Sequence, residues 1–401
     1  MTRLLGIRPD HRIRLDTALV TGAALTFVSF VVYWYAARDF DAGRGDFFYL
    51  ADAFLHGRTY LQFQPGPFDV IIVGARFYVP FAPFPAIALM PIVALLGPLT
   101  ADHVESGINA ALAAAGIGLA WWMLGRMGVR RLTDRFWLTL LFGFSTQILW
   151  ITTRGGVWHT GQLIATILTF ACLIELRGGR RAWLIGLLAG AAFLTRAPLA
   201  FAIPFYALLL MPSARGIPWR RWVWLAVGVA PALVFFLAYN LVRFGSPFES
   251  GYELATLPDW LERQRMLGLF ALTHLPTNLD YFLFHLPKVV PGFPFFRPDG
   301  LGLSVFITSP GLLYAVRADW HDRRSWWLAG AALLVLIPSL LYYGGGWLQY
   351  GFRYFLDSVP FVIALCGSAA ATRGRIGLGW RVLIVFGVVV MAMGAYWAHV
   401  I

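Results

Sequence analysis

The sequence predicts an all-α protein that crosses a membrane many times, with about eleven transmembrane helices. Of its 401 residues, 59% are hydrophobic and only 13% are charged, and the mean hydropathy is +0.68. A soluble domain carries roughly a quarter charged residues. Apolar runs of about 17–22 residues recur along the chain, and each is long enough to cross roughly 30 Å of hydrocarbon.

Charge and cysteine content exclude two other classes. The net charge of +12 does not indicate nucleic-acid binding, because the basic residues alternate with apolar spans and no aromatic-basic binding module is present. Cys172 and Cys366 both lie inside apolar runs, so we expect neither disulfides nor a cysteine-based metal site. The basic start of the chain leads into a span that is too long for a signal peptide, so we expect this span to be retained.

Basic clusters predict the orientation, because Lys and Arg gather in cytoplasmic loops. The clusters lie at positions 3–14, 126–135, 177–181, 215–221, 317–324 and 373–381. All fall on one side if segment 78–96 lies on the outer face as broken, interfacial or re-entrant helices. If this segment crosses, the later clusters move outside. Its four prolines argue against one continuous helix. We therefore predict a cytoplasmic N-terminus and an external C-terminus.

This orientation predicts a single membrane domain over residues 1–401. Its spans are residues 17–37, 105–125, 136–153, 160–176, 182–195, 197–212, 222–242, 302–316, 325–343, 357–371 and 382–400. The main external segments are residues 38–104, 243–301 and 342–357. The first of them should hold amphipathic juxtamembrane helices on the outer leaflet. Most carboxylates fall outside on this map, so acid chemistry is expected on the external side.

A short helix should follow the first span. Asp46 begins it, apolar residues recur at helical spacing, and Gly57 should end it. Asp52 is expected to pair with His56 one turn later. In the plain structural interpretation, Asp46 is only the N-cap of this helix.

Asp46 is also the first candidate for chemistry. It follows the first span directly, where a carboxylate is costly unless it is solvated, paired or used. Asp39 and Asp41 are reserve candidates. Tyr49 and His56, on the same predicted helix, are candidate substrate contacts.

Two short external loops hold the other candidates. In loop 153–162, Arg154, Trp158 and His159 are candidate substrate contacts. The preceding glycines allow close backbone approach, and the indole offers a flat face to a sugar ring. A lone histidine at a span boundary is also common as a plain interface residue.

The last external loop places Arg353 four residues before Asp357. In the plain structural interpretation, the two form an ion pair along one helical turn within an aromatic interface belt. In the functional interpretation, Arg353 binds an anionic phosphate through forked hydrogen bonds, and Asp357 is a candidate substrate contact. Arg196, at the outer end of the fifth span, has a similar but weaker claim.

The order of these features resembles the GT-C superfamily of polytopic glycosyltransferases, in particular bacterial protein O-mannosyltransferases and lipid A aminoarabinose transferases. The resemblance rests on Asp46 after the first span and on several later segments. These segments are FYVPFAPFPAIALMP, FLTRAPLAFAIPF, YNLVRFGSPFESGYEL and GWLQYGFRYFLDSVPF.

The resemblance implies that a sugar moves from a polyprenyl-phosphate donor to a lipid, glycan or protein acceptor on the extracytoplasmic side of the plasma or inner membrane. It makes Asp46 the general base and Arg353, with Arg196, the ligand of the donor phosphate. Some members have a further acidic residue in the second external loop, where this chain has His159. No metal or other cofactor is therefore predicted.

Two other classes are compatible with a polytopic chain. A transporter or flippase of lipid-linked saccharides would place polar residues along a midplane path and would show two similar halves. Asn109 is the clearest polar residue within a span, and no matching halves are visible. A scaffold subunit without activity is the third class, and it would tolerate replacement of Asp46.

Overall fold

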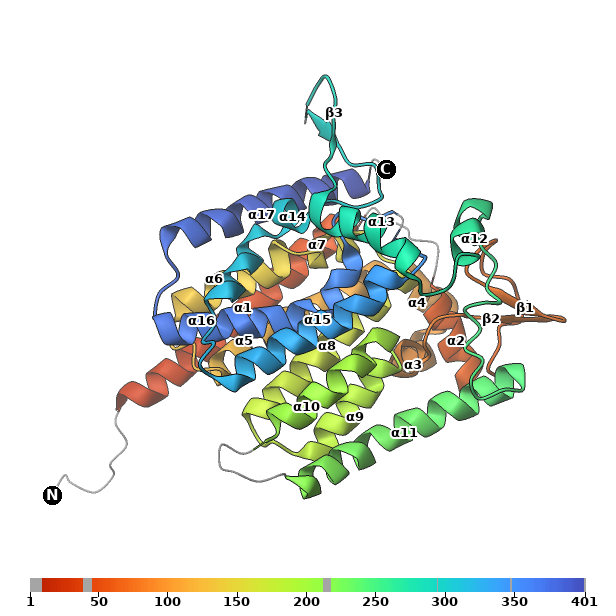
Figure 1. Cartoon of the computed structure of the whole chain (residues 1–401), viewed down its shortest axis with the longest axis horizontal. Coiled ribbons are helices and arrows are strands. Elements are labelled where there is room, and N and C mark those ends of the chain that lie inside the picture. Colours follow the sequence, from red (N-terminus) through yellow and green to blue (C-terminus); the bar gives the residue numbers. More distant parts are fainter. Residues whose placement is uncertain (1–8, 39–44, 212–217, 294, 347, 400–401) are drawn as a thin grey trace.

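The structure is a computed structural model, and it describes residues 9–38, 45–211, 218–293, 295–346 and 348–399. Most of these residues are helical, and the strands among them form two short antiparallel hairpins. Figure 1 shows long helices lying side by side in one bundle, with short elements gathered at one end of it. The reserve candidates Asp39 and Asp41 lie outside the described residues.

The bundle is built from long helices and from several shorter or broken ones. The long helices are α1 Pro9–Ala37, α5 Glu105–Arg126, α8 Val157–Arg177, α11 Trp219–Phe244, α15 Arg323–Leu341 and α17 Leu378–Ala398. The shorter elements are α6 Leu132–Phe144, α7 Ile148–Arg154, α9 Ala182–Phe193, η1 Ala197–Ala202, α10 Ile203–Leu209, α14 Val305–Thr308, η4 Pro310–Arg317, η5 Arg353–Asp357 and α16 Val359–Arg373.

The remaining elements lie in the two long connecting segments. The first segment contains α2 Asp46–Leu55, β1 Ile71–Val73, β2 Arg76–Tyr78, α3 Phe84–Leu96 and α4 Pro98–His103. The second contains α12 Asp259–Arg265, η2 Leu272–His274, α13 Leu275–Leu279, the π-helical turn η3 Asp280–Phe284, β3 Lys288–Val289 and β4 Phe296–Arg297. We call the end of the bundle where α2, α3, α4 and α12 gather the loop end (Figure 1).

The prediction of a helical, multi-pass membrane protein is confirmed, whereas the number of spans stays a prediction. Among the described residues, six helices are long and apolar enough to cross a membrane, or seven if α6 and α7, bent by 43°, form one span. Four further apolar stretches are only 10–17 residues long. The predicted eleven spans need three of these stretches, Ala182–Phe193, Ala197–Leu209 and Val359–Arg373, and also segment 302–316 to cross.

Three predicted spans are broken, each for a local reason. Span 136–153 breaks between α6 and α7, where the Thr146 hydroxyl hydrogen-bonds to the Phe142 carbonyl one turn back. Span 302–316 becomes α14 and the 3₁₀ helix η4, with Pro310 at the junction. Span 197–212 begins as a 3₁₀ helix that contains Pro198.

The proline-rich segment 78–96 forms no helix over its whole length. Helix α3 begins at Phe84, after Pro83, and continues through Pro91 for 13 residues. At 1.5 Å per residue it is about 20 Å long, shorter than the roughly 30 Å hydrocarbon core. It packs against α2 instead of crossing the bundle beside the long helices.

Backbone hydrogen bonds join the two long segments to each other. The Asp69 amide donates to the Thr256 carbonyl at 2.8 Å, and the Thr256 amide donates to the Val70 carbonyl at 2.8 Å. Ile71 also forms an isolated β-bridge with Ala255. Residues almost two hundred positions apart in the sequence therefore form one structural unit at the loop end.

A second hairpin, β3–β4, projects from the bundle and has a histidine at its base (Figure 1). His285 Nδ1 lies 2.9 Å from Asp280 Oδ2, and Nε2 lies 3.0 Å from Asp299 Oδ2. Burial lowers the pKa of His285, but the two carboxylates outweigh burial and raise it overall. The protonated ring donates to both carboxylates at once, which the neutral ring cannot do.

We expect the stabilisation supplied by His285 to depend on pH. Because its folded-state pKa is raised, this stabilisation is fully present below the unfolded-state pKa of about 6.5 and is lost as pH rises through the folded value. Thermal unfolding in detergent should separate wild type from His285→Gln more widely near pH 6 than near pH 9. The exposed His321 provides a control, His321→Gln, and a gap of equal size at both pH values would contradict the expectation.

Candidate functional site

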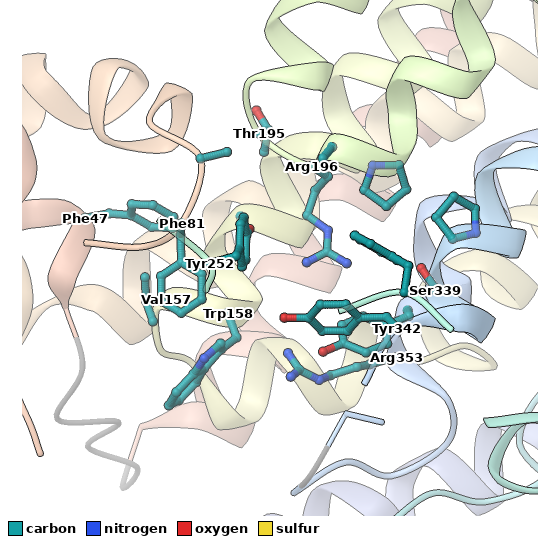
Figure 2. A pocket seen from close by; sticks show the side chains of 17 residues that line it. Phe47, Phe81, Val157, Trp158, Thr195, Arg196, Tyr252, Ser339, Tyr342 and Arg353 are labelled. Carbon is teal, nitrogen blue, oxygen red and sulfur yellow. The ribbon is translucent and has the colours of Figure 1, made fainter. Parts of the chain in front are cut away.

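Two neighbouring cavities lie at the loop end and share one wall. The Arg196 cavity is lined by that residue and by residues of α2, α8 and α15. The Asp69 cavity is lined by that residue and also by Arg154 and His159. The shared wall consists of Phe81, Trp158, Tyr342, Arg353 and Tyr354. Figure 2 shows Arg196 and Arg353 facing Phe81 and Trp158 across an open space.

Arg353 is held by its backbone, which leaves its side chain in the wall. Its amide donates a hydrogen bond to Gln349 Oε1 at 3.0 Å, and its carbonyl accepts one from Gln162 Nε2 at 2.9 Å. The residue is 7% exposed, and its Nε is buried with no hydrogen-bond partner among the described residues. The guanidinium carbon lies 4.9 Å from the Tyr354 ring centre. A buried guanidinium with unused donors can bind an anion.

A glycine two residues earlier makes this placement possible. Gly351 has φ +85°, and a Cβ atom there would lie 2.6 Å from Gln147 Nε2. The backbone turns at this glycine before η5 begins with Arg353. A larger residue at position 351 would therefore have to displace either the turn or Gln147.

Asp357 pairs with Arg196 and not with Arg353. Arg196 Nη2 lies 2.9 Å from Asp357 Oδ2, and its Nε lies 3.0 Å from the same oxygen. Burial opposes the charge of Arg196, but the Asp357 carboxylate outweighs burial and raises the Arg196 pKa. The interpretation of Arg353 and Asp357 as a structural pair is therefore wrong. The partner of Asp357 is Arg196, which lies at the junction of α9 and η1, far away in the sequence.

Tyr354 lies close to both arginines. The Arg196 guanidinium carbon is 5.3 Å from its ring centre, which is similar to the distance from Arg353. An aromatic face attracts a cation within about 6 Å. The ring therefore helps to hold two positive groups at one wall, of which Arg196 forms an ion pair with Asp357.

Asp69 brings a carboxylate to the same cavity as Arg353, and the sequence analysis did not identify it. It is partly buried and has φ +55°, a left-handed conformation that aspartate tolerates better than most residues. Such backbone strain is often found at functional sites. The signal in the sequence was weak, because Asp69 is a single acidic residue that follows a Pro-Gly-Pro-Phe turn.

Asp46 begins α2, as predicted, but it is not the N-cap. The N-cap is Gly45, and Asp46 is the first helical residue, where a negative charge suits the helix dipole. Asp46 is 1% exposed and is not among the residues that line either cavity, although its neighbour Phe47 lines the Arg196 cavity. The helix ends at Leu55, before Gly57, as predicted.

Other acidic residues surround the start of α2. Tyr49 donates to Asp102 Oδ2 at 2.9 Å. Burial, this hydrogen bond and the charges of Asp102 and Asp46 raise the pKa of Tyr49 to about 12. The phenol is therefore a stable hydrogen-bond donor to a carboxylate, and we find Tyr49 outside both cavity linings.

The first turns of α5 and α8 form a buried polar cluster. Thr160 Oγ1 lies 2.9 Å from Glu105 Oε1 and 2.9 Å from Asn109 Oδ1. All three residues are at most 5% exposed. The cluster lies at the loop end of these helices and not along their length, so the buried polar groups gather on the side where the cavities are.

The remaining candidates have mixed outcomes. Arg154 and His159 line the Asp69 cavity, and Trp158 lines both cavities. Arg154 also donates to the Ala398 carbonyl at 3.0 Å, and the His159 ring hydrogen-bonds to the Gly155 carbonyl. The predicted pair of Asp52 and His56 is confirmed at 3.4 Å, but it lies outside both linings.

Three further wall residues, Phe81, Tyr342 and Tyr354, were missed individually. Aromatic residues are so frequent in this chain that no local pattern separates them from an interface belt. Arg243 at the end of α11 helps to place the first segment, since its guanidinium donates to the Val79 carbonyl at 3.3 Å. In the described part of the chain, no three His, Cys, Asp or Glu residues are grouped as ligands for a metal ion.

Comparison with known proteins gives little further information. No family model matches this sequence, and no curated protein matches it. Among solved structures, the chain is similar to an oligosaccharyltransferase of Archaeoglobus fulgidus in its apo form, with a TM-score of 0.46 and 13% sequence identity. The match covers 95% of this chain and 54% of that one, so this chain spans about half the length of that protein. We base no argument on this match.

We expect the Arg196–Asp357 pair to be important for stability. Asp357 is 1% exposed, and removing one partner of a buried pair leaves an uncompensated charge, which costs about 3–5 kcal/mol. Arg196→Gln and Asp357→Asn should each lower the unfolding temperature in detergent. The double variant should lose less than the sum of the two losses, and strictly additive losses would contradict a direct pair.

Proposed function

We propose that this protein is a membrane glycosyltransferase of the GT-C type. It would move a sugar from a polyprenyl-phosphate-linked donor to an acceptor on the extracytoplasmic side. The observation that carries the proposal is the Arg353 guanidinium, which is buried in the wall between two cavities and makes no ion pair with a carboxylate among the described residues, since Asp357 pairs with Arg196.

The donor phosphate would bind at Arg353. A phosphate accepts two parallel hydrogen bonds from one guanidinium, and low polarity around the site strengthens them. As the bond between sugar and phosphate breaks, negative charge develops on the departing phosphate, and a fixed positive charge stabilises it. Arg196 would contribute at longer range, because its hydrogen bonds are already made with Asp357.

The sugar would lie against the aromatic part of the wall. Trp158 and Tyr342 line both cavities, and Phe81 packs edge-on to Trp158 with ring centres 6.5 Å apart. Aromatic rings offer an apolar face together with a polar edge. Arg154 and His159, which line the Asp69 cavity, would provide polar contacts to the substrate.

An acceptor hydroxyl needs a base that removes its proton as the new bond forms. We propose Asp46 for this role, supported by its burial in the first turn of α2 beside Phe47, which lines the Arg196 cavity. Asp69 is the second candidate, and a specific observation favours it, because it lines the same cavity as Arg353.

The side of the membrane follows from charge. The last turns of α5, α8 and α16 end in Arg126, Arg177 and Arg373, at the end of the bundle away from the cavities. The positive-inside rule makes that end cytoplasmic. We therefore propose a plasma-membrane or inner-membrane enzyme whose site faces out of the cytoplasm.

Replacing Arg353 should weaken binding of the carrier phosphate. Arg353→Gln removes both the positive charge and the planar guanidinium that donates two parallel hydrogen bonds, whereas Arg353→Lys keeps only the charge. Removing a hydrogen-bond donor to a developing anion typically lowers the rate by a factor of about 10²–10³. Arg353→Gln should therefore lower the rate of sugar transfer by a factor of that size, and Arg353→Lys should lower it less. Binding of polyprenyl phosphate alone can be measured by native mass spectrometry.

Lys288→Gln is the matched control, since it removes one exposed positive charge from β3, outside both cavities. If Arg353→Gln binds polyprenyl phosphate as well as Lys288→Gln does, Arg353 is not the phosphate ligand.

Replacing the base should affect transfer but not carrier binding. General-base catalysis raises a reaction rate by about 10²–10⁴-fold. The asparagine variant of the true base should therefore lower the rate of sugar transfer by a factor of that size and should still bind polyprenyl phosphate. Asp46→Asn and Asp69→Asn can be compared by release of polyprenyl phosphate from a panel of lipid-linked sugars. Asp52→Asn is the control on α2. Full transfer by both test variants would overturn the assignment of a carboxylate base to either residue.

A further inference from the structure

A third cavity lies at the opposite end of the bundle and is lined by four arginines. Arg126 and Arg177 come from the last turns of α5 and α8, Arg324 comes from the first turn of α15, and Arg180 follows α8. We call this cavity the arginine pocket. Helix α5 has 22 residues and connects the two ends of the bundle, so the arginine pocket lies about 30 Å from the cavities at the loop end.

The nearby carboxylates already have other partners. Glu175 accepts from Arg181 Nε at 2.9 Å and from Arg181 Nη2 at 2.8 Å. Asp322 is the N-cap of α15 and accepts from the Arg324 amide at 2.9 Å. Among the described residues, no ion pair joins a carboxylate to any of the four arginines of the pocket.

The guanidinium groups lie close enough for their charges to act on one another, and the charges of Asp322 and Glu175 offset them only in part. Arg180 donates from Nη2 to the Leu209 and Met211 carbonyls, and its Nε is buried with no hydrogen-bond partner in the described part of the chain. Its backbone has φ +52°, which is a strained conformation for arginine. Burial and the charges of Arg221 and Arg324 lower the pKa of Arg180. Like charges in a partly buried pocket repel each other unless an anion lies between them.

The rest of the lining is apolar. Met123, Leu173, Leu176 and Leu328 contribute to it. Arginine is the residue that best matches phosphate oxygens, because its planar fork donates two parallel hydrogen bonds. Basic pockets between transmembrane helices on the cytoplasmic side are typical sites for anionic lipid headgroups.

We propose that the arginine pocket binds a phosphate group, provided either by the headgroup of an anionic phospholipid or by a soluble phosphate compound. Arg177 and Arg324 would be its main ligands, since neither side chain makes a hydrogen bond or ion pair within the described residues that would otherwise occupy it. The site is separate from the proposed transferase site and does not depend on that activity.

The test uses the full-length protein in detergent micelles. Micelles containing phosphatidylglycerol are compared with micelles containing phosphatidylcholine, and inorganic pyrophosphate is compared with sodium chloride at equal ionic strength. The readouts are the unfolding temperature and, for lipid, the number of retained molecules in native mass spectra. Stabilisation by phosphatidylglycerol alone identifies a lipid headgroup site, and stabilisation by pyrophosphate identifies a site for soluble phosphate.

Variants separate a built site from general surface charge. Arg177→Gln and Arg324→Gln should each lower the affinity for the compound that stabilises the wild type by roughly tenfold or more, which is the loss expected for one charge-assisted hydrogen bond. Arg375→Gln removes one exposed positive charge at the same end of the bundle but outside the pocket, and it should respond like wild type. Without ligand, the two pocket variants should unfold at or above the wild-type temperature, because each removes a like charge.

Two results would overturn the proposal. One is a wild-type protein that responds to neither phosphatidylglycerol nor pyrophosphate. The other is a response of equal size in Arg177→Gln and Arg375→Gln, which would reflect net charge only. If Arg177→Gln does not fold, Arg324→Gln provides the same comparison.

Discussion

The buried ion pair between Arg196 and Asp357 determines the arrangement of the candidate site. It joins the junction of α9 and η1 to the end of η5, across 161 positions of the sequence. Asp357 needs a cation, because an isolated carboxylate is very costly to bury. Since Arg196 fills this need, Arg353 on the same short helix keeps its guanidinium for the cavity wall. The ion pair thus leaves Arg353 available for the role that we propose for it.

The rest of the site depends on how backbones are tied together. Gln349 and Gln162 hold Arg353 from both sides of its peptide unit, and Gly351 provides the turn before it. The first long segment is fixed independently, through backbone hydrogen bonds that join Asp69 and Val70 to Thr256. Rigid backbone positions on separate elements bring the shared wall together, which is the arrangement that a preorganised anion site requires.

The two ends of the bundle have opposite chemical character. At the loop end, buried carboxylates and hydroxyls gather near α2, α5 and α8, and Arg154, Arg196 and Arg353 line the cavities. At the other end, α5 and α8 finish in arginines around the arginine pocket, and no carboxylate is among the described residues that line it. Helices about 30 Å long separate the two ends. The two phosphate sites that we propose therefore lie at opposite ends of the bundle, with different residues at each.

Local features of this protein were determined by the sequence alone. The helical, membrane-crossing character follows from apolar content, and α2 with its Asp52–His56 pair follows from spacing within one or two turns. The pairing of Asp357 was decided only by the tertiary structure. One helical turn offered Arg353, but packing brought Arg196 closer. The same applies to Asp69, whose place in the cavity that Arg353 also lines depends on two segments that are far apart in the chain. Spacing reports neighbours along one helix, whereas a cavity is made by contacts between helices, and those depend on how every side chain packs.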